Sequence, residues 1–501
     1  MLLNAQLNPL HAGLQWRALR WPSDRPVAML FLVAAAVFLC ADARTAPFTL
    51  WDESRNIVNA LEMRRTGFSL VTTYGFEPDL WNTKPPLLIW LMMGSVALFG
   101  PAEWALRLPS LVASLGTLAL LLWFTRRVTG SLGTALFAGP MLLLSPAFFA
   151  GHAAHTADYD ALLTFFTTGY LSALFFAVTR STPRSATLAL AGLSIAGAVL
   201  TKSSAGLIPG AGVATYLLFT RRLPRVWAGP GYWLMAAVAA GPVLAFYLAR
   251  EAAGPGYLQA VLHNELFGRF NQSLIGRDEP AWFYVTDMLR GWLFAGPLLL
   301  LAPLGWSEVR GKSRALLVYC LCVALTLLAV LSTSSTKLPH YLLPAYPPLA
   351  IAAALLLRGA YQRVERVADT RLAGLALALF AGLSLTLLTA RAAYWRIVSL
   401  PAQQITPAGN YGALFAGLAS QSVIMAVVVD PGFRLDDWPA YAPVLRSYQL
   451  LWAERGLVAE RGHMGEVLAS CDPLSVSRLL AVGQDFAGVP NCAAVRSNDY
   501  R

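Results

Sequence analysis

The chain has 501 residues, of which 56% are hydrophobic and only 13% are charged, and its formal net charge at pH 7 is +11. Because soluble domains carry roughly 25% charged residues, this composition excludes a protein that is water-soluble over most of its length. The excess of Lys and Arg favours contact with a membrane surface over contact with nucleic acid, since no basic stretch interleaved with aromatic residues stands in a polar context.

Eleven apolar runs predict an all-α polytopic membrane domain. A helix needs about 20 mostly apolar residues to cross a bilayer. The runs near this length are 26–41, 108–124, 132–150, 161–178, 186–200, 205–219, 232–249, 288–306, 315–331, 341–357 and 372–390. We expect the first run to be retained rather than cleaved as a signal peptide. A shorter run, 85–99, should lie in the membrane interface as a juxtamembrane helix.

The charges of the loops support this count. If run 85–99 does not span, every second loop is basic, as expected on the cytoplasmic side of a membrane. These six loops hold Arg17, Arg20, Arg25, Arg126, Arg127, Arg180, Arg184, Arg221, Arg222, Arg225, Arg310, Lys312, Arg314, Arg358, Arg363, Arg366 and Arg371. The remaining loops hold nearly all the carboxylates between helices, so they should face the outer side.

The composition changes near residue 391. The tail is punctuated by Gly, Pro, Asp and Asn, and a β-like run at 422–429 ends in a turn sequence. We therefore expect residues 1–390 to form the membrane domain and residues 391–501 to form a small soluble α/β domain on the outer side. Cys471 and Cys492 lie in this tail, where they would be either two free thiols or, in an oxidising compartment, a disulfide.

Two adjacent acids, Asp52 and Glu53, open the first outer loop and are followed by Arg55. Carboxylates beside a membrane helix are costly unless they have partners. An acid here could simply cap the helix expected over 57–65, where it would interact well with the helix dipole. A functional role for Asp52 is favoured because further acids are expected on the same face of the membrane.

Those further acids are Asp158 and Asp160, at the start of the helix expected over 161–178. Capping this helix needs one acid, so the other is available for another role. Two carboxylates can coordinate a metal or act as a general base on an acceptor hydroxyl. The nearby His152 and His155 are more often bystanders than metal ligands.

Four cations stand on the outer side, where the positive-inside rule predicts few. Lys84, Lys202, Arg269 and Lys337 each adjoin the end of an expected helix. One such residue alone is readily explained by a side chain that extends from the membrane toward water. Four together favour an anionic headgroup, above all a phosphate, held by charge-assisted hydrogen bonds.

Six motifs in the outer loops occur in a distinctive order. They are Asp52-Glu53-Ser54-Arg55, Lys84-Pro85, Asp160-Ala161-Leu162-Leu163-Thr164-Phe165, Thr201-Lys202, Glu265-Leu266-Phe267-Gly268-Arg269-Phe270 and Lys337-Leu338-Pro339-His340-Tyr341-Leu342-Leu343-Pro344. Over roughly residues 45–350, this order resembles the bacterial aminoarabinose–lipid A transferases and the related protein O-mannosyltransferases, which are GT-C glycosyltransferases.

The resemblance implies a multi-pass enzyme of the bacterial inner membrane with its active site facing the periplasm. It would transfer a sugar, with inversion, from an undecaprenyl-phosphate carrier to a lipid, glycan or protein acceptor of the envelope. Asp52 would be the catalytic base and Asp160 the second acid, with Glu53 and Asp158 beside them. The residues expected to bind the substrate are Arg55, Lys84, Lys202, Glu265, Arg269, Lys337, His340 and Tyr341.

The sequence departs from the aminoarabinose enzymes at two positions implied to bind a metal. Thr83 stands where those enzymes have a Glu before the Lys-Pro pair, and Leu266 stands where they have a His. We therefore assign no metal ligands and expect no certain cofactor, although a divalent cation stays an open alternative. The tail has no counterpart that we recognise, and neither the acceptor nor the aminoarabinose donor is carried over.

Other functions are considered as well. A transporter or flippase for a lipid-linked glycan would place charged residues within several helices, around a site at the middle of the membrane. A scaffold for envelope assembly would tolerate replacement of Asp52 and Lys84. A glycan ligase or polymerase would differ in its acceptor alone. The charges gather on one side of the membrane, which favours chemistry at that surface.

Overall fold

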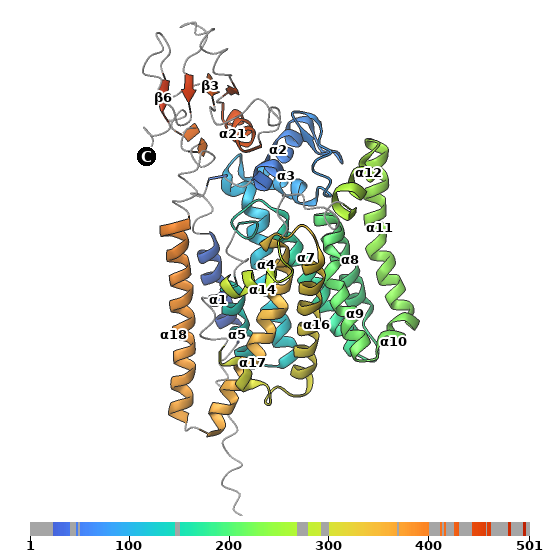
Figure 1. Cartoon of the computed structure of the whole chain (residues 1–501), viewed down its shortest axis with the longest axis vertical. Coiled ribbons are helices and arrows are strands. Elements are labelled where there is room, and N and C mark those ends of the chain that lie inside the picture. The colour runs from blue at the N-terminus through green and yellow to red at the C-terminus, as the bar shows by residue number, and fades with distance from the viewer. Residues whose placement is uncertain are drawn as a thin grey trace, which may run out of the picture.

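The structure is a computed structural model that describes residues 24–40, 47–48, 51–145, 151–267, 279–291, 300–367, 370–399, 411–412, 415–416, 425–429, 443–456, 458–461, 479–481 and 494–496. Long helices run along the longest axis of the molecule, and the short helices α2 and α3 and the C-terminal strands lie at one end (Figure 1). Apolar helices therefore form the body of the molecule, and the more polar segments gather at that end.

Within these described ranges, seven helical segments are long and apolar enough to cross a membrane. Four shorter apolar helices accompany them. The long segments are α4 (Glu103–Thr129), α7 (Tyr159–Thr179), α8 with η2 (Ser185–Lys202, Ser203–Gly206), α11 (Pro230–Ala253), α16 (Gly311–Thr333), η6 with α17 (Pro339–Ala345, Tyr346–Val367) and α18 with η7 (Thr370–Tyr394, Trp395–Ser399). The shorter ones are α1 (Asp24–Cys40), α3 (Leu87–Phe99), α5 (Leu132–Leu143) and α9 (Ile208–Phe219). The prediction of a multi-pass helical membrane protein is confirmed.

Ten of the eleven predicted runs coincide with one of these helices. The exception is run 288–306. Its ends lie in α14 (Phe283–Gly291) and η5 (Ala302–Gly305), and residues 292–299 lie outside the described part. The predicted interfacial segment is α3, whose 13 residues extend only about 20 Å, less than the hydrocarbon thickness of a bilayer.

Glycines allow the helix backbones to approach closely. A Cβ atom on Gly212 of α9 would lie 2.3 Å from the Cα atom of Val323 in α16. One on Gly305 of η5 would lie 1.7 Å from the backbone oxygen of Leu356 in α17. Larger residues would push these helices apart, as in other membrane bundles in which small residues mark the interfaces.

The C-terminal part contains a parallel sheet with the strand order β4-β3-β5-β6. The strands are β3 (Met425–Val429), β4 (Val458–Arg461), β5 (Leu479–Ala481) and β6 (Ala494–Arg496). The strand predicted at 422–429 is therefore confirmed over the residues that the structure describes. Cys471 and Cys492 lie outside them, and the domain boundary at 391 stays a prediction.

Helix α21 (Pro443–Ala453) of this C-terminal part packs against α2 (Trp51–Thr66). Arg446 Nη2 lies 3.1 Å from the fully buried Glu62 Oε1, and Arg65 Nε lies 3.0 Å from Glu454 Oε1. The backbone N–H of Phe48 donates a hydrogen bond of 2.8 Å to the hydroxyl of Tyr448. The tail therefore braces the helix that begins with the first acidic motif.

A buried ion pair fixes the other side of α2. Glu53 and Arg107 of α4 are each 1% exposed, and Arg107 Nε lies 2.7 Å from Glu53 Oε1. Glu53 Oε1 also accepts a hydrogen bond from the N–H of Ala157, and Arg107 Nη2 donates to the carbonyl of Pro47. This network ties α2, α4 and the segment before α7 together.

Replacing Arg107 should leave the Glu53 carboxylate buried without its partner. We expect Arg107→Ala to cost roughly 3–5 kcal/mol of stability, the usual effect of breaking a buried ion pair. The measurement is the melting temperature of the detergent-solubilised protein. Arg127→Ala, on the exposed last turn of the same helix, is the matched control and should melt like the wild type. Equal melting of the two variants would contradict a central role for this pair.

His155 provides a prediction for acid pH. Burial, with the nearby charge of Arg107, lowers the pKa of His155 to about 4. Below about pH 6.5 the imidazole therefore binds a proton in the unfolded chain but stays neutral in the folded chain. The contribution of His155 to the free energy of unfolding is complete above that pH and is lost as the pH falls toward 4. The full loss is about 3 kcal/mol. The melting temperature of the wild type should fall more steeply on acidification than that of His155→Gln, and parallel curves would contradict this account.

Candidate active site

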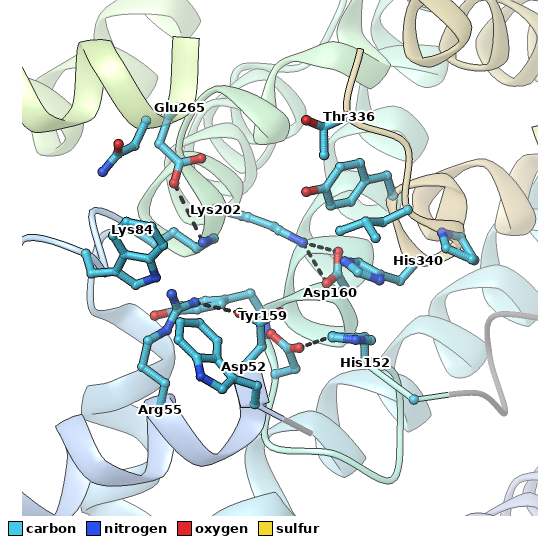
Figure 2. Close-up of a pocket in the computed structure, with 18 of the residues that line it drawn as sticks. Asp52, Arg55, Lys84, His152, Tyr159, Asp160, Lys202, Glu265, Thr336 and His340 are labelled. Atoms are coloured by element: carbon cyan, nitrogen blue, oxygen red, sulfur yellow. Dashed lines mark hydrogen bonds and ion pairs between the residues drawn. The ribbon is translucent and has the colours of Figure 1, made fainter. Parts of the chain in front are cut away.

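A cavity of about 670 Å³ opens at the end of the bundle where α2 lies. Its wall is built from the first turn of α2, the segments that precede α3 and α7, the end of α8, η3 (Leu262–Phe267), α14 and η6. The charged side chains labelled in Figure 2 point into this common space from these separate elements. The cavity therefore collects residues that are far apart in the sequence.

Nine of the predicted site residues line this cavity. They are Asp52, Arg55, Lys84, Asp158, Asp160, Lys202, Glu265, His340 and Tyr341. Arg269 lies outside the part of the chain that the structure describes. The outer loops of the sequence thus meet at one place, as a shared substrate would require.

Two predicted site residues, Glu53 and Lys337, are not among those lining the cavity. Glu53 follows Asp52 on α2, but its carboxylate is held by Arg107 as described above. The Nζ of Lys337 donates to the carbonyls of Ser334 and Glu279, at 2.7 and 3.0 Å. Both side chains therefore bind other parts of the protein around the site instead of lining the described wall of the cavity.

In the described wall of the cavity, each of the three permanent cations lies beside a carboxylate and an aromatic ring. Lys202 Nζ is 2.6 Å from both carboxylate oxygens of Asp160 and lies 5.1 Å from the ring centroid of Tyr341. Asp160 and Lys202 are buried, with 1% and 6% of their surface exposed. Such a pair holds its charge near lipid because each partner compensates the desolvation of the other.

The other two cations follow the same arrangement. Arg55 Nη2 is 2.8 Å from Asp52 Oδ1, within α2. Lys84 Nζ is 3.6 Å from Glu265 Oε1 and lies over the ring of Tyr159. The Asp52 side chain is 36% exposed, more than the acids deeper in the cavity. It is therefore the most accessible of the carboxylates that these cations contact.

The two acids at the start of α7 have different tasks. Asp158 is the N-cap residue of α7, and its Oδ1 accepts from the N–H of Tyr159. Its Oδ2 contacts Nδ1 of His152. Asp160, in the first turn, is bound to Lys202 instead. One of the two acids thus caps the helix, as expected, and a further role for Asp160 stays a prediction.

The contact between His152 and Asp158 changes the pKa values of both groups. Burial alone would lower the pKa of His152, but the Asp158 carboxylate raises it to about 8. Burial alone would raise the pKa of Asp158, but the imidazole holds it well below its usual range. His152 also has a positive φ of 70° and stacks on His340, with ring centroids 3.9 Å apart. The site therefore holds the His152 ring in a defined orientation.

An apolar hollow adjoins the inner end of the cavity. It shares Asp160, Lys202, Glu265 and Tyr341 with the main cavity. The rest of its wall is largely aliphatic and includes Leu163, Ile208, Pro209, Leu327, Leu331 and Pro344, from α7, α9, α16 and η6. Charged groups that would suit a phosphate thus stand at the mouth of a surface that would suit a hydrocarbon chain.

The structure adds Asp287 and Tyr159 to the cavity wall, and neither was predicted as a site residue. Tyr159 stands between the two acids of the α7 motif, and this position is a signal that sequence reasoning could have used. Asp287 adjoins a predicted membrane run; burial raises its pKa.

The Thr83 hydroxyl donates to Glu265 Oε1 at 3.1 Å, so the position implied to bind a metal in the aminoarabinose enzymes holds a hydrogen bond here and does not fit the metal.

The chain is similar to several known proteins. The family model described as dolichyl-phosphate-mannose-protein mannosyltransferase matches residues 83–247. An undecaprenyl phosphate-alpha-4-amino-4-deoxy-L-arabinose arabinosyl transferase of Shewanella sediminis is 31% identical over 310 residues, covering 60% of this chain and 55% of the relative. One from Pseudomonas aeruginosa is 30% identical over 342 residues, covering 66% and 59%. The chain thus spans less than two thirds of the length of these relatives.

The fold is shared with a solved structure. ArnT from Cupriavidus metallidurans, bound to undecaprenyl phosphate, superimposes with a TM-score of 0.63 at 17% identity, covering 90% of this chain and 92% of that one. The resemblance that the six outer-loop motifs indicated is confirmed: the chain is similar in sequence to aminoarabinose transferases and, over residues 83–247, to the protein mannosyltransferase family model, and it has the GT-C membrane fold.

Proposed function

We propose that this protein is an inverting glycosyltransferase that moves a sugar from a polyprenyl-phosphate carrier to an acceptor hydroxyl. The observation that carries the proposal is the cavity in which three cation–carboxylate contacts stand beside an apolar hollow. A polyprenyl-phosphate sugar has the matching parts: an anionic phosphate, a polar sugar and a long hydrocarbon chain.

The cations would bind the carrier phosphate by exchanging partners. Lys84, Lys202 and Arg55 already point into the cavity, where each contacts a carboxylate. The oxygens of an incoming phosphate can accept charge-assisted hydrogen bonds from the same donors. The phosphate then leaves more readily, because these cations stabilise the negative charge that develops as the glycosidic bond breaks.

Asp52 is the best candidate for the general base. Both oxygens of Asp160 are bound to Lys202, and Asp158 uses one oxygen to cap α7 and the other to contact His152. Among the described interactions, Asp52 uses Oδ1 alone, toward Arg55. Its second oxygen and its greater exposure make it suited to receive a proton from an acceptor.

The reaction follows from these positions. The acceptor oxygen attacks the anomeric carbon, and a new carbon–oxygen bond forms on the side opposite the phosphate. The bond from that carbon to the phosphate oxygen breaks, and its electron pair stays on the phosphate. The acceptor proton passes to Asp52, so no covalent enzyme intermediate is needed and the configuration inverts.

The location and partners follow from the same proposal. The site would face the periplasm from a bacterial inner membrane, because the described loops at the opposite end of the bundle carry many of the Arg residues. The donor would be undecaprenyl-phosphate-linked, carrying a hexosyl or a pentosyl group, and the acceptor a lipid, glycan or protein of the envelope. The acids and cations of the cavity gather at one end of the helices, which favours this reaction over transport through the middle of the membrane.

Replacing the base should stop the chemistry and spare the binding. We expect Asp52→Asn to reduce the rate of sugar transfer by about 10²–10⁴, the usual contribution of a general base. The measurement is transfer from a radiolabelled polyprenyl-phosphate sugar in membranes, together with donor affinity. The control is Glu77→Gln, which removes an exposed carboxylate of the same outer loop. Full turnover by Asp52→Asn would show that Asp52 is not the general base.

Removing a cation should weaken the binding of the carrier instead. Hydrogen bonds to charged groups contribute about 1.5–3 kcal/mol, so Lys84→Ala should raise the Kd for polyprenyl phosphate by roughly 10- to 100-fold. Binding is measured by calorimetry in detergent. Lys312→Ala removes an exposed lysine of the opposite end and should bind normally. If Lys84→Ala keeps the affinity of the wild type, the proposed phosphate site is wrong.

A further inference from the structure

The described wall of the cavity carries an excess of negative charge. It contains five carboxylates, three permanent cations and two imidazoles. Two negative charges are left over when both imidazoles are neutral, and one is left over when one imidazole is protonated, before an anionic donor enters. An additional positive charge inside the cavity would remove this obstacle to binding a phosphate.

Three donor groups converge beside the entrance of the cavity. Asp52, His152 and Asp158 each place one oxygen or nitrogen atom within 4.8 Å of the other two. Six donors around a divalent cation at about 2.1 Å lie about 3 Å apart when adjacent and about 4.2 Å apart when opposite. Small side-chain rotations would therefore bring all three onto one ion.

A second group, formed by His152, Asp160 and His340, meets the same distance limit but suits an ion less well. Both oxygens of Asp160 are already bound to Lys202. The rings of His152 and His340 are stacked face to face, so the in-plane lone pairs of the two imidazoles cannot point to one ion. In the first group, this stack instead holds the His152 ring in place.

We propose that Asp52, His152 and Asp158 bind one divalent cation in the Mn²⁺ to Zn²⁺ range. Carboxylates suit Mn²⁺ and imidazole suits Zn²⁺, so one imidazole with two carboxylates selects this range over Ca²⁺. Three protein ligands leave open positions toward the cavity, where an oxygen of the substrate can bind. The site is separate from the Thr83 and Leu266 positions, which do not supply ligands.

The cation would balance the excess charge of the cavity and admit the anionic donor. Asp52 has two carboxylate oxygens, so one would hold the ion and the other, which Arg55 would leave for the phosphate, would stay available for the acceptor proton. This part of the inference rests on the proposed function. The binding of the ion itself does not, because it depends on the three side chains alone.

The test uses the full chain, purified in detergent with any affinity tag removed, treated with EDTA and then dialysed. Mn²⁺ alone is titrated calorimetrically, and a single saturable site is expected in the wild type. His152→Asn and Asp158→Asn should each weaken this binding at least 10-fold. Asn tolerates the positive φ at position 152 and can still cap α7, so both variants should keep the melting temperature of the wild type. His263→Ala, which removes an exposed histidine of the outer side, should bind like the wild type.

The absence of saturable Mn²⁺ binding by the wild type, or equal binding by all variants, would overturn the inference. Its failure is distinguishable from failure of the proposed function. If the wild type binds no Mn²⁺ but still transfers sugar in EDTA, the metal site is wrong and the proposed transferase activity is kept. If the wild type binds Mn²⁺ and the Asp52→Asn variant transfers sugar normally, the ion site is kept and the role of Asp52 as the base is wrong.

Discussion

Charges at the boundary between lipid and water need partners, and this requirement organises the functional end of the protein. A single carboxylate or ammonium group buried here would lose several kcal/mol of hydration. The chain meets the requirement with pairs: Glu53 with Arg107, and Asp160 with Lys202. The first pair joins the outer loops into one body, and the second stands at the inner end of the cavity.

The pair of Lys84 and Glu265 suits an anionic substrate because its two charges are only loosely held together. Lys84 lies 3.6 Å from Glu265, at the long end of an ion pair, so a phosphate can compete for it. Glu53 and Arg107 are bound by several hydrogen bonds and are almost wholly buried, so no substrate can compete for them. Ion pairs between an acid and a cation thus stabilise the fold in one place and are available for binding in another. The difference is whether a substrate in the cavity can reach the pair.

The C-terminal part takes part in the architecture of the site. Helix α21 contacts α2 through Arg446, Glu454 and Tyr448, and the same helix α2 carries Asp52 and Arg55. The proposed base therefore stands on a helix that is held on one side by the membrane bundle and on the other by the tail. This arrangement suits a base that must keep its position while an acceptor approaches.

The sequence by itself determined the membrane fold. The length of an apolar run decides whether it can span the bilayer, and the excess of Arg and Lys in alternate loops decides the orientation, and both are local properties of the sequence. It also indicated which outer-loop acids and cations would meet, since helix order places alternate loops on one face. Only the tertiary structure separated Asp52 from Glu53: neighbours on a helix point about 100° apart, and one turns to the cavity while the other turns to Arg107. Only it showed that Lys337 binds backbone carbonyls, and that a distant tail braces α2. These outcomes depend on partners far away in the chain, which no local pattern records.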